Sequence, residues 1–409
     1  MLCITNMLLH DIDVPQVYHN NSLLKDVLDY TEDDQFDVIL YIIWSDVADK
    51  MRGVKVPVSP RRATLTPLIL PAFNGNQAAL SRNPKIASRM DRRAAGSVTR
   101  HWQRRSSLQI KYNPPFGIPW NREAKEVEAE YKKGNAGRFI PGLPAKGDGQ
   151  MLFLLNGVAK LKDDGQMAII QNGSSLFTGD AGSGQSEIRR YLIENDWLDA
   201  IVQLPTNAFY NTPITTYIWI VTKSKPAHRH GKVQLIDASA CGMSRRKNIG
   251  SKNTDISQNC RDLVVKAYGE FVDRTFDGLD ENGSSIMVKS KVIDAIEFGY
   301  NKITVESPVT DENGNIVLKK GKPVPDSSKR DTENVPLAED IDAYFEREVI
   351  PYNPDAWIDK KKTKVGYEIP FTRTFYEYKQ IEPSDVIAKR IEEHEKSLIA
   401  KLHDLFGEV

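Results

Sequence analysis

Residues 166–223 read QMAIIQNGSSLFTGDAGSGQSEIRRYLIENDWLDAIVQLPTNAFYNTPITTYIWIVTK, and this stretch decides the fold. Short apolar runs at 166–173, 197–205 and 215–223 have the length and β-branched content of buried strands. Apolar residues at helical spacing predict a helix over 186–195. Strands alternating with helices predict a parallel or mixed sheet covered on both faces. No helix separates the last two strands, which predicts an antiparallel hairpin at the sheet edge.

The same alternation extends outward from this stretch. Residues 148–161, DGQMLFLLNGVAKL, predict an amphipathic helix that ends at the DDG turn of residues 163–165. Residues 36–44, FDVILYIIW, predict another buried strand. The terminal residues 382–409 predict a long amphipathic helix, which packs either on its own domain or on a partner.

Residues 45–110 interrupt this pattern. The segment contains ten Arg and three Lys against three acidic residues, whereas Lys outnumbers Arg elsewhere in the chain. Its prolines and its lack of periodicity predict poor order. One interpretation is a basic arm that binds DNA phosphates. The favoured interpretation is a foreign or out-of-frame insert between two pieces of one domain.

Bulk properties exclude several classes of protein. The 409 residues predict two to three domains, and 55 basic against 55 acidic side chains exclude a globally basic surface. The odd set Cys3, Cys241 and Cys260 argues against a disulfide framework and for a reducing compartment, the cytoplasm. No run approaches the ~18 apolar residues of a membrane span, and no secretory signal opens the chain.

The tetrapeptide Asn113, Pro114, Pro115 and Phe116 carries the chemistry. It directly follows the short strand pattern LQIKY at 108–112. Two prolines fix the backbone and remove two N–H donors, so the loop presents the Asn113 side-chain oxygen and a backbone carbonyl as acceptors. Two acceptors can hold an exocyclic amine while Phe116 stacks on a flipped base. Taken alone, the pattern also fits a proline turn with an incidental aromatic.

Three other patterns suggest sites, and each has a simpler interpretation. The GDAGSGQS loop at 179–186 precedes a helix but lacks the lysine of a phosphate-binding loop, so it is expected to be a loop that approaches DNA. His228, His230, Cys241 and Cys260 fit no usual zinc spacing, and a solvated basic loop is the better interpretation. We expect no metal site. The acidic residues between 340 and 348 are expected to form a solvated helix face.

Beyond the tetrapeptide, a series of segments resembles the modification subunit of type I restriction-modification systems, an adenine-specific DNA methyltransferase family. The resemblance runs through NPPFG (113–117), GRFIPGLPAKGDGQMLFL (137–154), the stretch at 171–222, DTENVPLAEDIDAYFEREVIPYNPDAWID (331–359) and KVGYEIPFTRTFYEY (364–378). It covers residue 111 to the C-terminus almost continuously. The opening MLCITNMLLHDIDVPQVYHNNSLL (1–24) is similar to the part just before the catalytic loop.

The resemblance implies a fold, a reaction and partners. The fold is α/β, with a partial Rossmann-like class I methyltransferase sheet, helices on both faces and a helical C-terminal extension. The implied reaction is methylation of adenine in double-stranded DNA with S-adenosylmethionine as cofactor. Asn113 and the Pro114 carbonyl match the acceptors for the adenine amine, Pro115 completes the catalytic loop, and Phe116 matches the stacking platform. Asn21 matches the residue that faces the adenine ring of the cofactor. The implied partners are a specificity subunit and a restriction subunit.

Two alternatives to this reaction remain open, and the first comes from a departure from the family pattern. The family grips its cofactor through a loop of the type D-P-x-C-G-S-G-G and an acidic residue after the next strand, and the chain begins downstream of both. A truncated remnant that keeps only its contacts with DNA or the specificity subunit is therefore one alternative. A protein glutamine methyltransferase, which uses the same loop on a side-chain amide, is the other, and the match after residue 140 disfavours it.

These observations divide the chain into five parts. Residues 1–44 are a fragment of the methyltransferase core, 45–110 the insert, 111–240 the catalytic core, 241–381 a family-specific region and 382–409 the terminal helix. Because family members run from FDVIL straight into NPPF, residues 37–40 and 109–112 are expected to compete for one strand position. The segment adjoining NPPF is expected to occupy it.

Overall fold

A computed structural model describes residues 36–41, 109–112, 117–209, 212–312, 314–378 and 382–407. The chain divides into two units, residues 1–371 and residues 372–409. The five predicted parts are not tested by this division, and residues 1–35 and 42–108 lie outside the described residues. Within the described residues, no helix is both long enough and apolar enough to cross a membrane.

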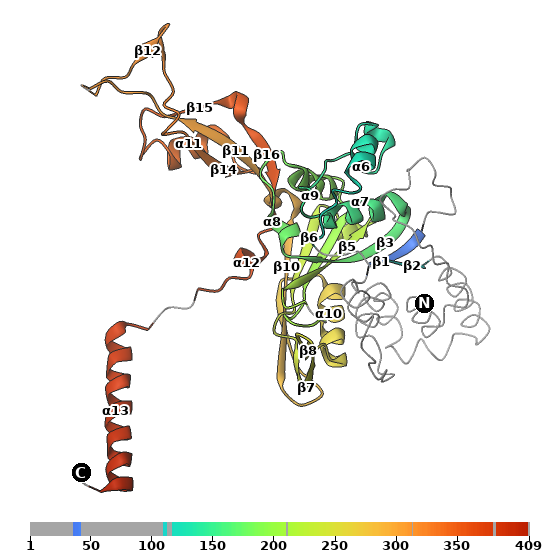
Figure 1. Cartoon of the computed structure of the whole chain (residues 1–409), viewed down its shortest axis with the longest axis vertical. Helices are drawn as coiled ribbons and strands as arrows, with labels where there is room; N and C mark the ends of the chain where they lie inside the picture. The colour runs from blue at the N-terminus through green and yellow to red at the C-terminus, as the bar shows by residue number, and fades with distance from the viewer. Residues whose placement is uncertain are drawn as a thin grey trace, which may run out of the picture. The chain divides into compact units, whose positions relative to one another are not determined.

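An eight-stranded mixed sheet forms the centre of the first unit (Figure 1). Its strand order is β2-β1-β3-β5-β4-β6-β10-β9. The strands are β1 (Phe36–Tyr41), β2 (Gln109–Tyr112), β3 (Leu161–Asn172), β4 (Leu198–Gln203), β5 (Thr216–Thr222), β6 (Lys232–Asp237), β9 (Arg274–Leu279) and β10 (Ser285–Asp294). The α/β prediction is therefore confirmed, while the Rossmann-like detail stays a prediction.

Helices and buried side chains cover this sheet. One face carries Ala168 and Ile170 of β3 and belongs to a core cluster that includes Val264 of α10 (Gln258–Glu270). Because neighbouring strand residues point to opposite faces, Met167 and Ile169 lie on the other face, and both are fully buried. Two helices precede β3 and β4 in the chain, α7 (Gln150–Lys160) and α9 (Gly184–Glu194), and both bury apolar side chains.

Two predicted details of the sheet are wrong. β4 and β5 do pair antiparallel, but β5 lies between β3 and β4 rather than at the sheet edge, because β6 pairs parallel with β4 and two more strands follow. The predicted DDG turn at 163–165 lies inside β3, which begins at Leu161 directly after α7. Strand pairing on both sides of β3 outweighs the local turn preference of these residues.

The expected competition between residues 37–40 and 109–112 does not occur. Both segments form strands of the same sheet and pair parallel with each other, with Tyr41 opposite Tyr112. β1, not β2, takes the place beside β3, and β2 is added at the edge. The open edge of β1 offers unpaired backbone groups to a second parallel strand, so one sheet accommodates both segments.

A smaller antiparallel sheet and several helices follow the main sheet. Its strands are β11 (Gly299–Glu306), β14 (Asp331–Pro336), β15 (Trp357–Ile358) and β16 (Lys364–Tyr367). Ile303, Val335 and Phe345 form its core, and Phe345 comes from α11 (Ile341–Glu348). Two hairpins, β7 (Met243–Ile249) with β8 (Lys252–Asp255) and β12 (Leu318–Lys319) with β13 (Lys322–Pro323), complete the described strands. The shorter helices are α6 (Ala124–Tyr131), α8 (Ser174–Phe177) and α12 (Phe371–Thr374).

The predicted C-terminal helix is confirmed as α13 (Ser384–Phe406), in the second unit. Six of its large apolar side chains are exposed by 46% or more, while Ile387 is half-buried. The exposed members are Val386, Ile391, Leu398, Ile399, Leu402 and Leu405.

The pairing of β1 with β2 predicts the effect of a deletion. Removing residues 42–112 joins Tyr41 directly to Asn113. Because Tyr41 and Tyr112 are partners in neighbouring strands, Asn113 would still follow the same row of the sheet, displaced by one strand spacing of about 4.8 Å. The variant is expected to keep a single cooperative urea transition, since β2, at the edge of the main sheet, is the only described strand that the deletion removes. Loss of the transition would show that residues 42–112 are an integral part of the domain.

Candidate catalytic edge

Six strands of the main sheet run in one direction, namely β1, β2, β3, β4, β6 and β9, and the first five of these end at one edge. β1 is parallel to both β2 and β3. β3 and β4 are each antiparallel to β5, so these two run in the same direction. β6 is parallel to β4. The register connects Tyr112, Ile169, Ile201 and Leu235 through their partners into one row across the sheet. The segments that follow β2, β3, β4 and β6 therefore leave from the same edge, the position where open α/β sheets bind ligands. We call this the carboxyl edge.

The predicted catalytic residues Asn113, Pro114, Pro115 and Phe116 lie outside the described residues, as does Asn21. Their flanks are described. β2 ends at Tyr112, so Asn113 follows the last residue of a strand at the carboxyl edge. Gly117, directly after Phe116, has a φ of 56°, a conformation that favours glycine.

The segment that leaves the tetrapeptide is firmly anchored. The Trp120 backbone N–H donates to the Lys146 carbonyl (3.1 Å), and its indole Nε1–H donates to the Ala145 carbonyl (3.0 Å). The Gly149 N–H donates to the Ile118 carbonyl (3.1 Å), and Trp120 is buried. The described flanks of residues 113–116 are thus fixed, by a paired strand on one side and by a buried tryptophan on the other.

A polar cluster lies where this anchor meets the end of β3. It consists of Asp148, Gln150, Asn172 and Ser174, and the sequence analysis did not identify it. Gln150 Nε2 lies 2.6 Å from Asp148 Oδ2, 2.8 Å from Asn172 Oδ1 and 2.7 Å from Ser174 Oγ, while Gln150 Oε1 accepts from the Asn172 N–H (3.1 Å). The cluster joins the start of α7 to the carboxyl end of β3. The sequence signal for this polar cluster was the polar run QNGSS at 171–175, where the buried strand ends.

A buried arginine shapes the next loop of the edge. The Arg189 side chain is fully buried, and all of its acceptors are backbone carbonyls. Its Nη1 donates to the carbonyls of Ser175 and Thr178 (both 3.0 Å), and its Nε donates to that of Tyr367 (2.6 Å). Burial lowers the pKa of Arg189 to about 10, so it stays cationic near pH 7. The turn it holds exposes Phe177 at the carboxyl edge.

The GDAGSGQS loop packs against protein rather than presenting an open cradle. A Cβ at Gly184 would lie 1.8 Å from the Leu143 carbonyl oxygen, so only glycine fits there. The Ser183 hydroxyl caps α9 by accepting from the Ser186 N–H, and Asp180 forms an ion pair with Lys302 (2.7 Å). The packing and the ion pair give this loop a structural role.

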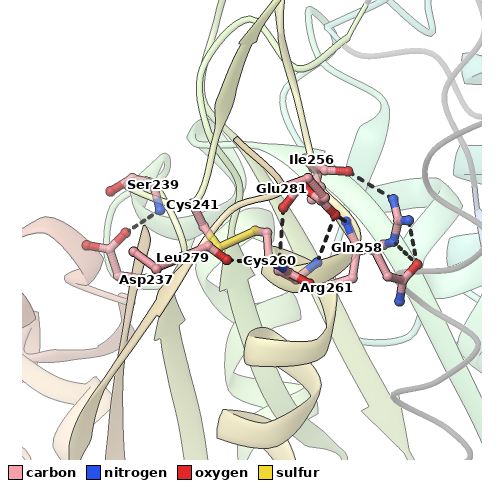
Figure 2. The surroundings of a disulfide bond; sticks show 11 residues. Asp237, Ser239, Cys241, Ile256, Gln258, Cys260, Arg261, Leu279 and Glu281 are labelled. Atoms are coloured by element: carbon pink, nitrogen blue, oxygen red, sulfur yellow. Dashed lines mark hydrogen bonds between the residues drawn. A yellow bond between two sulfur atoms is a disulfide. The ribbon is translucent and has the colours of Figure 1, made fainter. Parts of the chain in front are cut away.

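The cysteines differ from the sequence prediction. Cys241 and Cys260 form a disulfide, although no disulfide framework was expected (Figure 2). The two cysteines are 19 residues apart in the sequence, and the chain between them folds back through the β7–β8 hairpin. Their Cα atoms therefore lie 5.6 Å apart. Their sulfur atoms are therefore not available as zinc ligands, and His230 lies against Asp196 instead (2.9 Å). Among the described residues, no group of three or more potential ligands could hold a metal ion.

Comparison with known proteins gives consistent matches. The model of the N-6 DNA Methylase family matches residues 88–313, more than half of the chain. The type I restriction enzyme MjaIX methylase subunit of Methanocaldococcus jannaschii is 29% identical over 140 residues, which cover 34% of this chain and 24% of that protein. The HindI methylase subunit of Haemophilus influenzae is 26% identical over 202 residues, covering 49% of this chain and 39% of that protein.

A solved structure matches as well. The methyltransferase subunit of a type I restriction-modification system from Streptococcus thermophilus has 24% identity and a TM-score of 0.35, covering 46% of this chain and 34% of that chain. The matched parts span about a quarter to two fifths of the two curated relatives. The resemblance to modification subunits of type I systems is thereby confirmed. The chain belongs to the N-6 DNA methylase family.

Proposed function

We propose that this protein methylates the amino group of adenine in duplex DNA, with S-adenosylmethionine as methyl donor, as the modification subunit of a type I restriction-modification system. One observation carries the proposal: the tetrapeptide 113–116 is bracketed by β2 at the carboxyl edge and by the anchored Trp120. Membership of the N-6 DNA methylase family supports the reaction, and the relatives named as methylase subunits support the type I system.

In this proposal the tetrapeptide holds the target base. The Asn113 side-chain oxygen and the Pro114 carbonyl accept the two N–H groups of the adenine amine, which turns its lone pair out of the ring plane. Phe116 stacks on the flipped base. The cofactor supplies an electrophilic methyl group on a sulfonium sulfur. The amine nitrogen would take this methyl group as the carbon–sulfur bond breaks to leave a neutral thioether, and it would release one proton to solvent. The tetrapeptide contributes position rather than covalent chemistry.

Partners follow from the same assignment. The specificity subunit selects the DNA sequence and the restriction subunit cleaves unmodified DNA, so the chain itself needs sequence-independent contacts with the duplex. The balanced charge of the whole chain requires those contacts to be local.

A methyl-transfer assay tests the proposed reaction. The full chain, its specificity subunit and duplex DNA are incubated with S-adenosylmethionine labelled in the methyl group, and the expected product is labelled N6-methyladenine. Label on a protein glutamine side chain instead of DNA would contradict the proposal and favour glutamine methylation.

Titration calorimetry with S-adenosylmethionine examines the cofactor separately. The 409 residues contain no D-P-x-C-G-S-G-G loop, so we expect the isolated chain to bind weaker than the low micromolar range, which corresponds to about −8 kcal/mol. Asn21→Ala should weaken binding further, whereas Asn334→Ala, on an exposed part of β14, should not. A low micromolar dissociation constant would contradict this expectation and show that other residues replace the loop.

A further inference from the structure

The hairpin of β7 and β8, residues 243–255, is a basic element that follows β6 at the carboxyl edge. It contains Arg245, Arg246, Lys247 and Lys252 against a single carboxylate, Asp255, a net charge of 4 − 1 = +3. Arg245 and Lys252 both pair with Asp255, the latter at 3.0 Å. The one acidic residue of the hairpin is therefore already shared between two cations.

Two cations remain available at the surface. Arg246 and Lys247 are exposed, and neither forms an ion pair with any residue in the described ranges. The same strand is exposed through Asn248 and Ile249 to Gly250 at the turn, which has a φ of 59°. Both cations lie on β7 between two paired rows, Ser244 opposite Thr254 and Ile249 opposite Lys252, where the register of the hairpin shifts.

Several contacts fix the base of the hairpin. The disulfide of Cys241 and Cys260 joins the residues just before β7 to α10, and Figure 2 shows α10 beginning beside this bond. The Asn253 and Thr254 N–H groups both approach the carbonyl of Asn207, at 3.3 Å, in the loop that follows β4. Ordering two long cationic side chains costs less when their backbone is already held.

The hairpin leaves the sheet at the same edge as the catalytic tetrapeptide. It follows β6, which is parallel to β4, and the row of partners links Leu235 of β6 to Tyr112 of β2. Five strand spacings of roughly 4.8 Å separate β2 from β6, about 24 Å in all. At 3.4 Å per base pair this is about seven base pairs, so one duplex can reach both elements.

We propose that the β7–β8 hairpin binds the phosphate backbone of duplex DNA through Arg246 and Lys247. This inference rests on the proposed function only in taking the bound polyanion to be duplex DNA. Exposed cations that have no carboxylate partner among the described residues, on a hairpin whose base is fixed at the carboxyl edge, match the sequence-independent contacts that position a protein on DNA. They supply affinity and leave sequence selection to other elements.

Fluorescence anisotropy with a labelled 30-base-pair duplex tests this at salt concentrations from 50 to 200 mM. R246Q/K247Q is expected to weaken binding about tenfold or more at 100 mM salt. It should lower the slope of log K against log salt by about 1.8, which is two contacts at about 0.9 each. R246K/K247R, which keeps both charges, should retain the slope.

The β12–β13 hairpin provides a matched control. K319Q/K320Q removes two exposed lysines from another β-hairpin, which belongs to the region around the smaller sheet. This variant should leave the affinity and the salt slope unchanged. Urea unfolding of all three variants confirms that they fold.

The outcomes separate this inference from the proposed function. DNA binding that depends on Arg246 and Lys247 supports the hairpin contact even when no methyl transfer occurs. An unchanged slope in R246Q/K247Q, an equal loss in K319Q/K320Q, or no duplex binding by the wild-type chain would each overturn it.

Discussion

Asn113→Ala is expected to lower the rate of methyl transfer to duplex DNA by at least about 100-fold. The substitution removes one of the two acceptors proposed to hold the adenine amine, and loss of a single positioned hydrogen-bonding group at a reaction centre typically costs 10²–10³ in rate. Affinity for the duplex should change little, because Asn113 is not proposed to contact a phosphate. Labelled methyl transfer and DNA anisotropy, measured on the same preparations, give both quantities.

Two further variants make this result specific. Asn334→Ala removes an asparagine side chain from an exposed strand position and should leave the rate unchanged. Phe116→Ala should lose less activity when the target adenine is mismatched, since flipping an unpaired base costs less. Full activity of the Asn113 variant would contradict the role assigned to the tetrapeptide.

Arg189→Met is expected to lower the free energy of unfolding by roughly 3–5 kcal/mol. Methionine fills a similar space but leaves the carbonyls of Ser175, Thr178 and Tyr367 without their shared cationic donor. A buried unsatisfied group costs about 1–3 kcal/mol, and relief from burying a charge offsets part of the sum. Urea unfolding followed by circular dichroism measures the difference.

The neighbouring residue supplies the control for Arg189. Arg190 lies on the exposed side of α9 and pairs with Glu194 (2.9 Å). Because exposed ion pairs contribute about 0–1 kcal/mol, Arg190→Met should have little effect on stability. Similar losses in the two variants would show that helix propensity or charge, rather than the carbonyl contacts, explains the effect of Arg189.

The α/β class was predictable because its signal is local. Strands β3, β4 and β5 each contain a short apolar run, at 167–170, 200–202 and 217–221, and every residue of β5 is buried. Apolar residues at helical spacing predicted a helix over 186–195, and α9 (Gly184–Glu194) confirms its existence but begins two residues earlier, after the hydroxyl cap of Ser183. The tetrapeptide 113–116 and the resemblance along residues 111–378 indicated the family before any contact was known.

The sequence by itself determined the main strands and helices between residues 148 and 223, apart from the turn expected at 163–165, because apolar periodicity acts over a few residues. Only the tertiary structure decided their neighbours: β5 inside the sheet, β1 and β2 side by side, and Cys241 beside Cys260. The tertiary structure also decided the position of Arg189, which the helical pattern alone would have allowed to face solvent. Arg189 instead donates to backbone carbonyls, including that of Tyr367, which is distant in the sequence. Pairing and burial join residues far apart in the chain, and their free energy exists only once the sheet has assembled.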